Sequence, residues 1–549
     1  MAHFDSKRRQ FLQFAAFGTM VAAWPGFILV EAAKMNNASS SAFKPDVEIE
    51  LTARPDTVSL KPGAATKVFK YHAQLIKGPT TTLTNMPSYL GPILNFVRGQ
   101  KVRIIAYNDL PEPTVAHWHG LHVPQKMDGH PMYAINPGER YIYEFEIKNP
   151  AGTNWYHAHT HEKTATQVYQ GLAGLITISD EQEQKLALPN GEYDLPLVIQ
   201  DRRLTVDNQL QYLQHGRRER MLGFLGDTIL INGQINRTIP VKTRAYRLRL
   251  LNASNSRIYK LGWEDGTPLT AIGTDGALLE KPETFPYIML APAERVELWV
   301  DFSGREVGSD LILQSLEYHG VMPHMGGGMR GGMGMMRGGL AQGSKFPLVK
   351  FHIAEKTSES PQLPAQLIKF QRLTDRDVAN PDKPIQIGLS MRHMSPELNH
   401  RSFEMLAVAE GEKIPVNTIQ KIRIYQEEHG MHGGGRRGMG RMEDDADGME
   451  GRGGMRSGRG GMMEMAHPIH LHEQQFQILS RLIKDSHGSG YATVKDGFIN
   501  SGWKDTVLVM PGEEVTIIKP FQDYTGLYLY HCHNLEHEDM GMMRNFLVS

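Results

Sequence analysis

Short runs of alternating or continuous hydrophobic residues, separated by turn residues, recur along most of the chain. Examples are residues 101–107, 141–147 and 296–300. Alternation with a period of two is typical of β-strands that bury one face. Pro-Gly pairs at Pro137-Gly138 and Pro511-Gly512 precede further runs and favour tight turns into antiparallel strands. Since no long amphipathic helical pattern dominates, the sequence predicts an all-β array of sandwiches.

Two tracts rich in glycine and methionine interrupt this strand pattern. Residues 322–343 contain six methionines and residues 429–465 contain eight, which together make 14 of the chain's 29. Gly-rich runs cannot offset the entropy of ordering, so both tracts are predicted to be loops inserted into a folded body. Two other interpretations stay open. The tracts could be low-complexity spacers, and their Arg-Gly repeats at 451–454 and 458–461 are also typical of RNA-binding tails.

The N-terminus has the charge and hydropathy order of an export signal. Lys7, Arg8 and Arg9 precede Phe11-Leu12 and an apolar stretch to about Val30. The twin arginine favours the Tat route, and residues 1–33 are assigned to targeting, as a cleaved signal or an uncleaved anchor. A first buried helix is the alternative. The mature protein is therefore predicted to be periplasmic.

Length and charge limit the remaining possibilities. A chain of 549 residues is long enough for about three domains. Its 59 Lys plus Arg nearly balance 60 Asp plus Glu, which gives no support to nucleic-acid or anionic-membrane binding by the whole protein. One cysteine excludes an internal disulfide, so that thiol is either incidental or chemical.

The single cysteine lies in a C-terminal segment that is dense in histidine. On a strand, His531 and His533 project from one face while Cys532 projects from the other, so one peptide can serve two metal sites. Cys532, His537, a further histidine and an axial Met542 would form the His₂Cys-plus-thioether set of a blue-copper centre.

Three upstream segments supply the remaining histidines. Residues 466–472 contain three, of which His470 and His472 share a strand face and leave His467 for the blue-copper centre. The N-terminal third contains two further His-X-His pairs on predicted strands. The predicted histidine cluster has eight imidazoles: His117, His119, His157, His159, His470, His472, His531 and His533.

These four segments resemble the four copper signatures of the multicopper oxidases, in the family's order. The resemblance covers most of the chain and implies three cupredoxin-like Greek-key β-sandwich domains with Met/Gly-rich loop insertions. The expected domains are residues 46–182, with trinuclear ligands; 190–356, with no copper motif and the loop 322–343; and 365–549, with type 1 and trinuclear ligands and the loop 429–465.

The resemblance also implies four copper ions with a defined ligand set. The type 1 copper is expected at His467, Cys532, His537 and Met542; the type 2 copper at His117 and His470; and the type 3 pair at His119, His157, His159, His472, His531 and His533. Glu538 and Asp128 resemble the acidic residues that the copper-efflux branch uses for proton supply and for tuning near the type 2 copper, whereas solvated carboxylates are the alternative. The nearby His122, His130 and His161 lie outside the ligand pattern.

The electron donor is a separate question, because the family oxidises phenols, amines and several metal ions. An axial methionine favours easily oxidised donors, and clustered thioethers bind soft Cu(I) better than hard metal ions. Copper-efflux oxidases resemble this chain in carrying a Met-rich insert over the type 1 site. They hold substrate copper with an Asp and a Met, where this chain has Met463 and Met465 with Glu464 between them; these three residues are the candidate ligands of a substrate copper.

We therefore expect a periplasmic cuprous oxidase for copper tolerance, with laccase-like side activity. It would use O₂ and Cu(I) or small phenolic donors, act as a monomer, and bind additional labile copper. It would not bind nucleic acid, and it would meet a membrane only through its export signal. A laccase-like oxidase of phenols, amines or another metal ion is the enzymatic alternative, and a periplasmic copper-sequestering protein is the non-enzymatic one.

Overall fold

The computed structural model describes residues 37–322, 340–392, 395–427, 465–483 and 490–549. The predicted signal, most of both Met-rich tracts, Met463 and Glu464 lie outside these residues. Residues 36–549 form one compact unit. No helix in the described part is long and apolar enough to cross a membrane.

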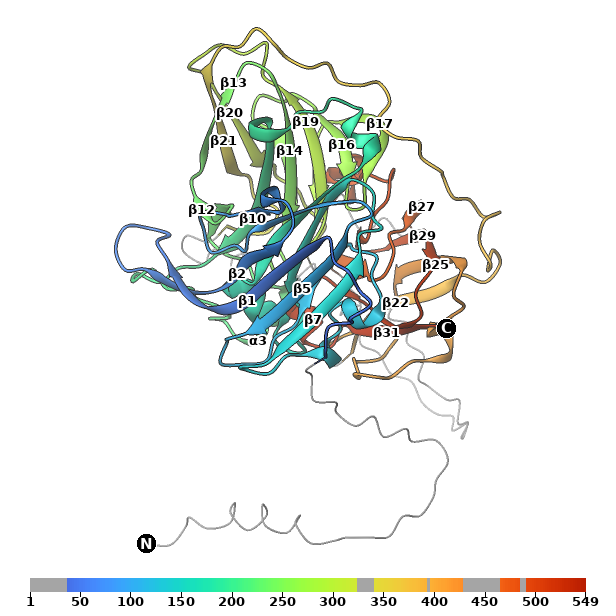
Figure 1. The fold of residues 1–549 in the computed structure, drawn as a ribbon. Helices are drawn as coiled ribbons and strands as arrows, with labels where there is room; N and C mark the ends of the chain where they lie inside the picture. Colours follow the sequence, from blue (N-terminus) through green and yellow to red (C-terminus); the bar gives the residue numbers. More distant parts are fainter. Residues whose placement is uncertain (1–36, 323–339, 393–394, 428–464, 484–489) are drawn as a thin grey trace, which may run out of the picture. The chain divides into compact units, whose positions relative to one another are not determined.

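The predicted all-β class is confirmed, and the N-terminal strands form two sheets (Figure 1). One has the order β2-β1-β5-β7 and the other β3-β4-β9-β8-β6. The strands are β1 (Val47–Val58), β2 (Thr66–Lys77), β3 (Leu83–Thr84), β4 (Ile93–Val97), β5 (Lys101–Asn108), β6 (Ala116–His117), β7 (Arg140–Glu146), β8 (Gly152–Ala158) and β9 (Ala173–Ser179). The runs expected at 101–107 and 141–147 fall in β5 and β7.

The middle of the chain forms another pair of sheets, with orders β12-β11-β10-β14-β19-β16-β17 and β13-β21-β20-β15-β18. Their strands are β10 (Asp194–Arg202), β11 (Thr228–Ile231), β12 (Gln234–Ile235), β13 (Thr238–Lys242), β14 (Ala245–Asn252), β15 (Tyr259–Trp263), β16 (Leu269–Thr274), β17 (Leu278–Phe285), β18 (Ile288–Leu290), β19 (Arg295–Asp301), β20 (Asp310–Ser315) and β21 (Phe346–Glu355). A large apolar core lies between these sheets.

The C-terminal sheets have the orders β23-β22-β25-β29-β27 and β24-β31-β30-β26-β28. Their strands are β22 (Ile385–Arg392), β23 (Ser395–Leu398), β24 (Lys413–Ile414), β25 (Thr418–Gln426), β26 (His467–Leu471), β27 (Gln477–Ile483), β28 (Thr506–Val509), β29 (Glu513–Phe521), β30 (Gly526–Cys532) and β31 (Met543–Val548). The described α-helices are short: α1 (Thr164–Gln170), α2 (Glu181–Gln184), α3 (Arg217–Leu222) and α4 (Leu535–Asp539).

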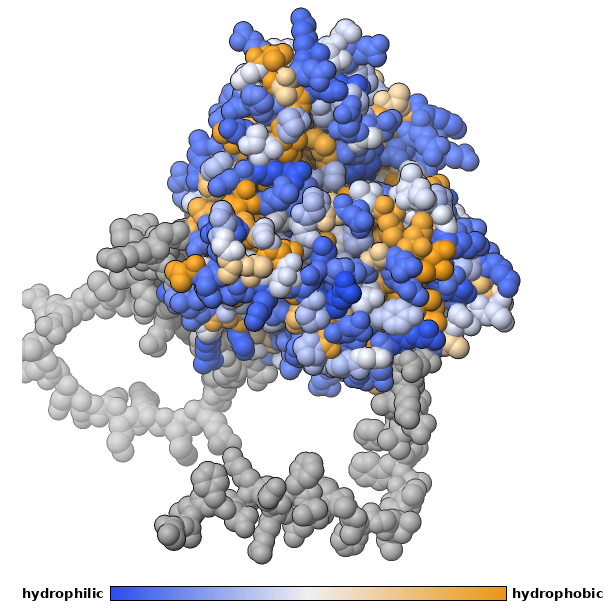
Figure 2. Space-filling model, turned by 60° about the vertical axis from the view of Figure 1, so that its left-hand side comes forward, coloured by the Kyte–Doolittle hydropathy of each residue, from blue (hydrophilic) through white to orange (hydrophobic). Residues whose placement is uncertain are grey.

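Two strand pairs set the position of the histidine cluster. In the N-terminal part β6 pairs with β8, which places His117 opposite His157. In the C-terminal part β26 pairs with β30, which places His470 opposite His531. Figure 2 shows one face of the molecule, which is mostly hydrophilic and has hydrophobic residues in patches.

Candidate metal centre

The C-terminal sulfur site brings together side chains from three elements. The Sγ atom of Cys532, at the end of β30, lies 3.5 Å from Nδ1 of His467 and 3.8 Å from Nδ1 of His537. His537 is on α4, and its Nε2 donates to the carbonyl of Met221 at 2.9 Å, which leaves the Nδ1 lone pair facing the sulfur. Burial lowers the pKa of His537 to about 4 and raises the pKa of Cys532. Two neutral imidazoles and one thiol therefore converge as a soft donor set.

Met542 lies beside this group. Its side chain is fully buried in the same apolar core as Cys532. Its backbone is fixed from both sides: the amide of Cys532 donates to the carbonyl of Met542 at 3.0 Å, and the amide of Met542 donates to the carbonyl of His537 at 2.9 Å. Met542 is thus linked to the other three residues expected to hold type 1 copper through its backbone and a shared apolar core.

The eight imidazoles of the histidine cluster also come together, and none is more than 2% exposed. In each His-X-His pair the first histidine belongs to a strand and the second follows its end: β6 ends at His117, for example, so His119 lies in a turn. This differs from the prediction of two histidines within one strand. The rings of each pair nevertheless remain neighbours, with centroids 4.9–5.9 Å apart.

His117 and His470 have one nitrogen fixed and one free. Nδ1 of His117 donates to the carbonyl of Asp128 at 2.6 Å, and Nδ1 of His470 donates to the carbonyl of Asp505 at 2.8 Å. Their Nε2 atoms are buried and have no hydrogen-bond partner among the described residues. A buried polar atom without a partner is costly, and a lone pair fixed in this way is what a metal ion requires.

A second group consists of His159, His472 and His531. Nε2 of His531 lies 3.1 Å from Nε2 of His472 and 3.3 Å from Nε2 of His159. Nδ1 of His472 donates to Asp128 Oδ2 at 2.7 Å, so its Nε2 is an acceptor, and Nδ1 of His531 faces the carbonyl of Cys532 at 3.2 Å. Facing lone pairs repel one another unless a cation or a proton lies between them.

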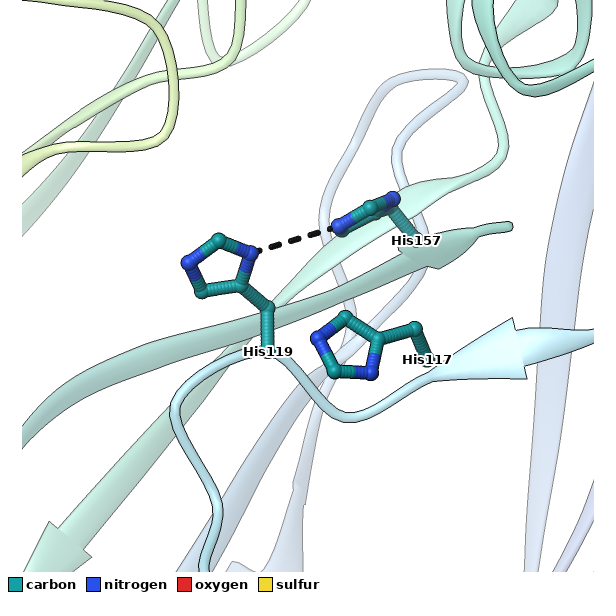
Figure 3. Close-up of side chains that lie close together, drawn as sticks. All are labelled: His117, His119 and His157. Carbon is teal, nitrogen blue, oxygen red and sulfur yellow. Dashed lines mark hydrogen bonds between the residues drawn. The ribbon is translucent and has the colours of Figure 1, made fainter. Parts of the chain in front are cut away.

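The third group contains His119, His157 and His533. Nδ1 of His119 lies 3.4 Å from Nε2 of His157 (Figure 3), while the opposite nitrogens donate to Asp505 Oδ1 at 3.0 Å and to the carbonyl of Ala158 at 2.9 Å. Neither nitrogen of His533 has a hydrogen-bond partner among the described residues. Burial lowers the pKa of His157 to about 4, which keeps this ring in the neutral form that metals bind.

The two predicted acidic residues are buried against these imidazoles, so they are not solvated carboxylates. Glu538 has one oxygen 3.1 Å from Nδ1 of His531 and the other 3.7 Å from Nε2 of His159. Burial raises its pKa, but these histidines outweigh burial and the net pKa falls below the ordinary value. For Asp128, burial and the nearby Glu473 raise the pKa well above the ordinary value.

Sequence reasoning missed Asp505. Its side-chain oxygen lies close enough to His119 and His470 for the three to share a metal ion. A lone aspartate in Lys504-Asp505-Thr506 has no motif that would have marked it.

The three histidines that the sequence left outside the ligand pattern contact protein groups. His122 bonds Asp523 and His130 bonds Asn545, both at 3.0 Å, and His161 lies 3.8 Å from Glu162.

The described ends of the two Met-rich tracts meet beside the sulfur site. Met322 and Met465 line one small cavity together with Pro468 and Asn534. The amide of Ala466 donates to the carbonyl of Val321 at 3.0 Å, so the residues next to these two tract ends are bonded to each other just before His467. Met465, one of the three candidate substrate-copper ligands, is only 4% exposed.

An all-β fold with a sulfur-containing His₂Cys site beside an eight-imidazole cluster defines the class of copper oxidases. Family models described as multicopper oxidase match residues 68–183 and 459–549. Multicopper oxidase mco of Staphylococcus haemolyticus is 30% identical over 475 residues, covering 86% of this chain and 84% of that protein. A laccase of Bacillus stratosphericus is 29% identical over 514 residues, covering 85% and 90%.

Solved structures agree with these matches. McoA multicopper oxidase of Aquifex aeolicus has a TM-score of 0.72 at 29% identity, covering 92% of this chain and 97% of that one. The Campylobacter jejuni multicopper oxidase, described as a metallo-oxidase, has a TM-score of 0.67 at 26% identity, covering 91% of each chain. The chain belongs to the multicopper oxidase family. It is a copper-dependent, laccase-like oxidoreductase that passes electrons from reducing substrates to O₂.

Proposed function

We propose that the chain binds four copper ions in the arrangement that the sequence predicts. His467, Cys532, His537 and Met542 would hold type 1 copper; His117 and His470 type 2 copper; and His119, His157, His159, His472, His531 and His533 the type 3 pair. The supporting observation is the set of buried imidazole nitrogens that face one another or lack partners. We also propose that the three sheet pairs correspond to domains at residues 46–182, 190–356 and 365–549.

When bound, the copper ions would supply one-electron acceptance and storage of the four electrons that O₂ reduction to water requires. The protein's part is to hold two buried sites a short covalent path apart. Cys532 belongs to one site, and its chain neighbours His531 and His533 belong to the other, so the backbone at the end of β30 connects the two sites directly. The fully buried Cys532 keeps solvent away from this path.

Protons would reach the histidine cluster through two acids. Glu538 lies between His159 and His531, and Asp128 bonds His472, so each has a carboxylate within reach of a ring that the proposal places at copper. A carboxyl group at hydrogen-bonding distance is placed to hold or deliver a proton during turnover. Their burial next to imidazoles supports this role.

For the electron donor, we propose Cu(I). Met322 and Met465 both line one small cavity, together with the two residues that flank His467, and the adjoining sequence tracts contain many more soft thioethers. The metallo-oxidase of Campylobacter jejuni agrees with a metal donor, whereas the laccase of Bacillus stratosphericus agrees with the phenol-oxidising alternative. We further propose that the chain is exported to the periplasm by the Tat route, acts there as a monomer in copper tolerance, and binds additional labile copper.

The test compares O₂ consumption with Cu(I) and with a phenol as donors. Met322 and Met465 are replaced together by leucine, which keeps the volume but removes the thioether. The expected result is a severalfold lower kcat/KM for Cu(I) and an unchanged value for the phenol. The matched control replaces the partly buried Met86 and Met405, which lie in other apolar clusters, in the same way.

Unchanged Cu(I) turnover in this double variant, and in a variant lacking residues 429–462, would favour the laccase-like oxidase instead. Copper binding by the wild-type protein without O₂ consumption from either donor would favour the copper-sequestering alternative.

A further inference from the structure

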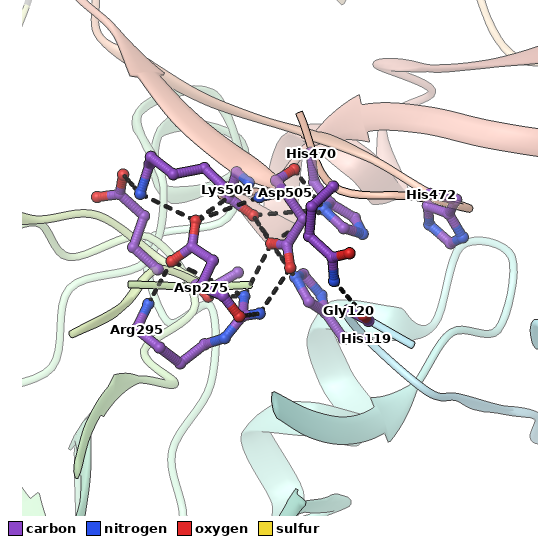
Figure 4. A network of polar contacts seen from close by, with 12 residues as sticks. His119, Gly120, Asp275, Arg295, His470, His472, Lys504 and Asp505 are labelled. Atoms are coloured by element: carbon purple, nitrogen blue, oxygen red, sulfur yellow. Dashed lines mark hydrogen bonds and ion pairs between the residues drawn. The ribbon is translucent and has the colours of Figure 1, made fainter. Parts of the chain in front are cut away.

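One side chain of the middle sheets reaches the surroundings of the histidine cluster, although that part of the chain has no copper motif. Arg295, the first residue of β19, is only 1% exposed. Its guanidinium donates two parallel hydrogen bonds to the carboxylate of Asp505, from Nη1 to Oδ1 at 2.8 Å and from Nη2 to Oδ2 at 2.6 Å (Figure 4). This bidentate geometry fixes the direction of the carboxylate as well as neutralising it.

Asp505 in turn bonds two members of the histidine cluster. Its Oδ1 accepts from Nε2 of His119 at 3.0 Å, and its backbone carbonyl accepts from Nδ1 of His470 at 2.8 Å. These bonds decide which nitrogen of each ring keeps its lone pair. His119 therefore presents Nδ1 toward His157, whereas His470 presents Nε2.

Arg295 is itself held rigidly by three backbone carbonyls. Its Nε donates to Thr153 of β8 at 3.0 Å, Nη1 donates to Ala293 at 3.0 Å, and Nη2 donates to Asp275 at 2.6 Å. One side chain thus joins the N-terminal, middle and C-terminal sheets at the edge of the cluster. A carboxylate held by a fixed guanidinium has little freedom to turn away from His119.

The backbone next to His119 is packed against the same pair. Gly120 has a φ of +91°, and a Cβ atom there would clash with Oδ1 of Asn154 and would lie 2.8 Å from Arg295 Nη2 and 3.0 Å from Asp505 Oδ2. The turn that aims His119 therefore fits only without a side chain at position 120. This contact is independent of the hydrogen bonds described above.

We propose that Arg295 is a positioning residue for the trinuclear copper site, acting through Asp505 on His119 and His470. This inference rests on the proposed ligand assignment. Removing the guanidinium leaves a buried carboxylate without its counterion, and the side chain of Asp505 is then expected to reorient. His119 then loses its bond to Oδ1 of Asp505. His470 keeps its backbone partner but loses the carboxylate oxygen that lies 3.6 Å from its Nδ1, while His467, Cys532 and His537 are untouched.

The test is copper retention in Arg295→Met, read site by site after copper loading. Total copper, the visible absorption of type 1 copper and the paramagnetic resonance signal of type 2 copper are followed during competition with a chelator. The matched control is Arg257→Met. Arg257 is another fully buried arginine, in the connection between β14 and β15. It donates to Asp201 at 2.8 Å and to the carbonyls of Gly226, Leu340 and Ala341, none of which is a proposed ligand.

We expect Arg295→Met to retain trinuclear copper roughly 10–100-fold less tightly while type 1 absorption is unchanged. Arg257→Met should match the wild type at both sites. Arg295→Lys keeps the positive charge but loses the bidentate geometry, so its retention of trinuclear copper should fall between those two variants. Gly120→Ala should show the same selective loss as Arg295→Met.

Wild-type retention of trinuclear copper in Arg295→Met overturns the proposal. That result would mean that Asp505 and the histidines hold the metal without Arg295. Joint loss of type 1 and trinuclear copper overturns it as well, because Arg295 would then stabilise the fold in general. Wild-type protein that binds neither kind of copper would instead refute the proposed function, so the two failures are distinguishable.

Discussion

At the scale of single residues, Cys532 lies at the point where the chain passes between the two groups of metal-binding side chains. Its thiol is fully buried in an apolar core and faces His467 and His537, while the residues on either side of it turn into the histidine cluster. Serine at this position would be nearly isosteric, so packing would change little. The chemistry depends on sulfur, because a hydroxyl is a poor ligand for a soft copper site.

Cys532→Ser is accordingly expected to abolish the blue absorption and the oxidase activity. The fold and the copper at the proposed trinuclear site should remain, because the eight imidazoles are unchanged. Visible absorption, copper analysis and O₂ consumption check this. Residual wild-type turnover in the variant would contradict the assignment of Cys532 to the electron path.

At the scale of elements, β14 and β19 are joined by buried ion pairs that extend to the N-terminal sheets. Glu297 of β19 accepts from Arg247 at 2.7 Å and Arg249 at 2.9 Å, both on β14, and from Thr153 of β8 at 2.6 Å. Burial raises the pKa of Glu297, but the two arginines outweigh it and the pKa falls from 4.5 to about 2. The ionised form is therefore tied to the native packing of these strands.

This depressed pKa predicts acid sensitivity. The contribution of Glu297 to the free energy of unfolding, about 3 kcal/mol, is fully present above pH 4.5 and is lost as the pH falls toward 2. Glu297→Gln should lower stability at pH 7 by about 3–5 kcal/mol, because it leaves buried arginines underpaired, and should flatten the acid dependence. Denaturant midpoints between pH 7 and pH 2 test this, with the exposed Glu280→Gln as control; equal acid dependence in Glu297→Gln and wild type would refute it.

At the scale of the whole molecule, the histidine cluster joins chain segments that are far apart in sequence. His159 and His531, whose nitrogens lie 3.3 Å apart, are separated by 372 residues. Closing so long a loop lowers the conformational entropy of the chain, and facing lone pairs add repulsion rather than a compensating attraction. Bound copper would convert this repulsion into a link between the N-terminal and C-terminal sheets.

Removing copper should therefore lower Tm without altering the β-structure. Each ion present at a hundredfold excess over its Kd contributes roughly 3 kcal/mol to the stability of the folded state. Calorimetry of chelated and copper-loaded protein, with circular dichroism to confirm the fold, measures this difference. Recovery of Tm on adding copper, but not magnesium, is the control, and an identical Tm in both forms would contradict the prediction.

The export prediction also concerns the whole molecule. Replacing Arg8 and Arg9 together by lysine keeps the charge but removes the twin-arginine pair. We expect the protein to accumulate in the cytoplasm, as measured by cell fractionation, while Lys7→Arg is exported normally. Undiminished periplasmic protein in the double variant would rule out the Tat route.

The sequence by itself predicted the all-β class, which is confirmed, and a set of copper donors, which stays a prediction. Alternation with a period of two is a local property of the backbone, so the spacing of His531, Cys532 and His533 already assigned them to two sites. The structure keeps that division even though the second histidine of each pair follows the end of its strand. The sequence also predicted that the four histidine-rich segments form one cluster, because each contains a His-X-His pair.

Only the tertiary structure decided which groups surround those imidazoles. Arginine and aspartate occur throughout the chain, so nothing local distinguishes Arg295 or Asp505 from solvated charges. The structure also decided that Asp128 and Glu538 are buried. The sequence had left each of them as either a solvated or a functional carboxylate. The reason is physical: a side chain's period and type follow from its neighbours in sequence, whereas its partners and its pKa follow from what the fold packs against it.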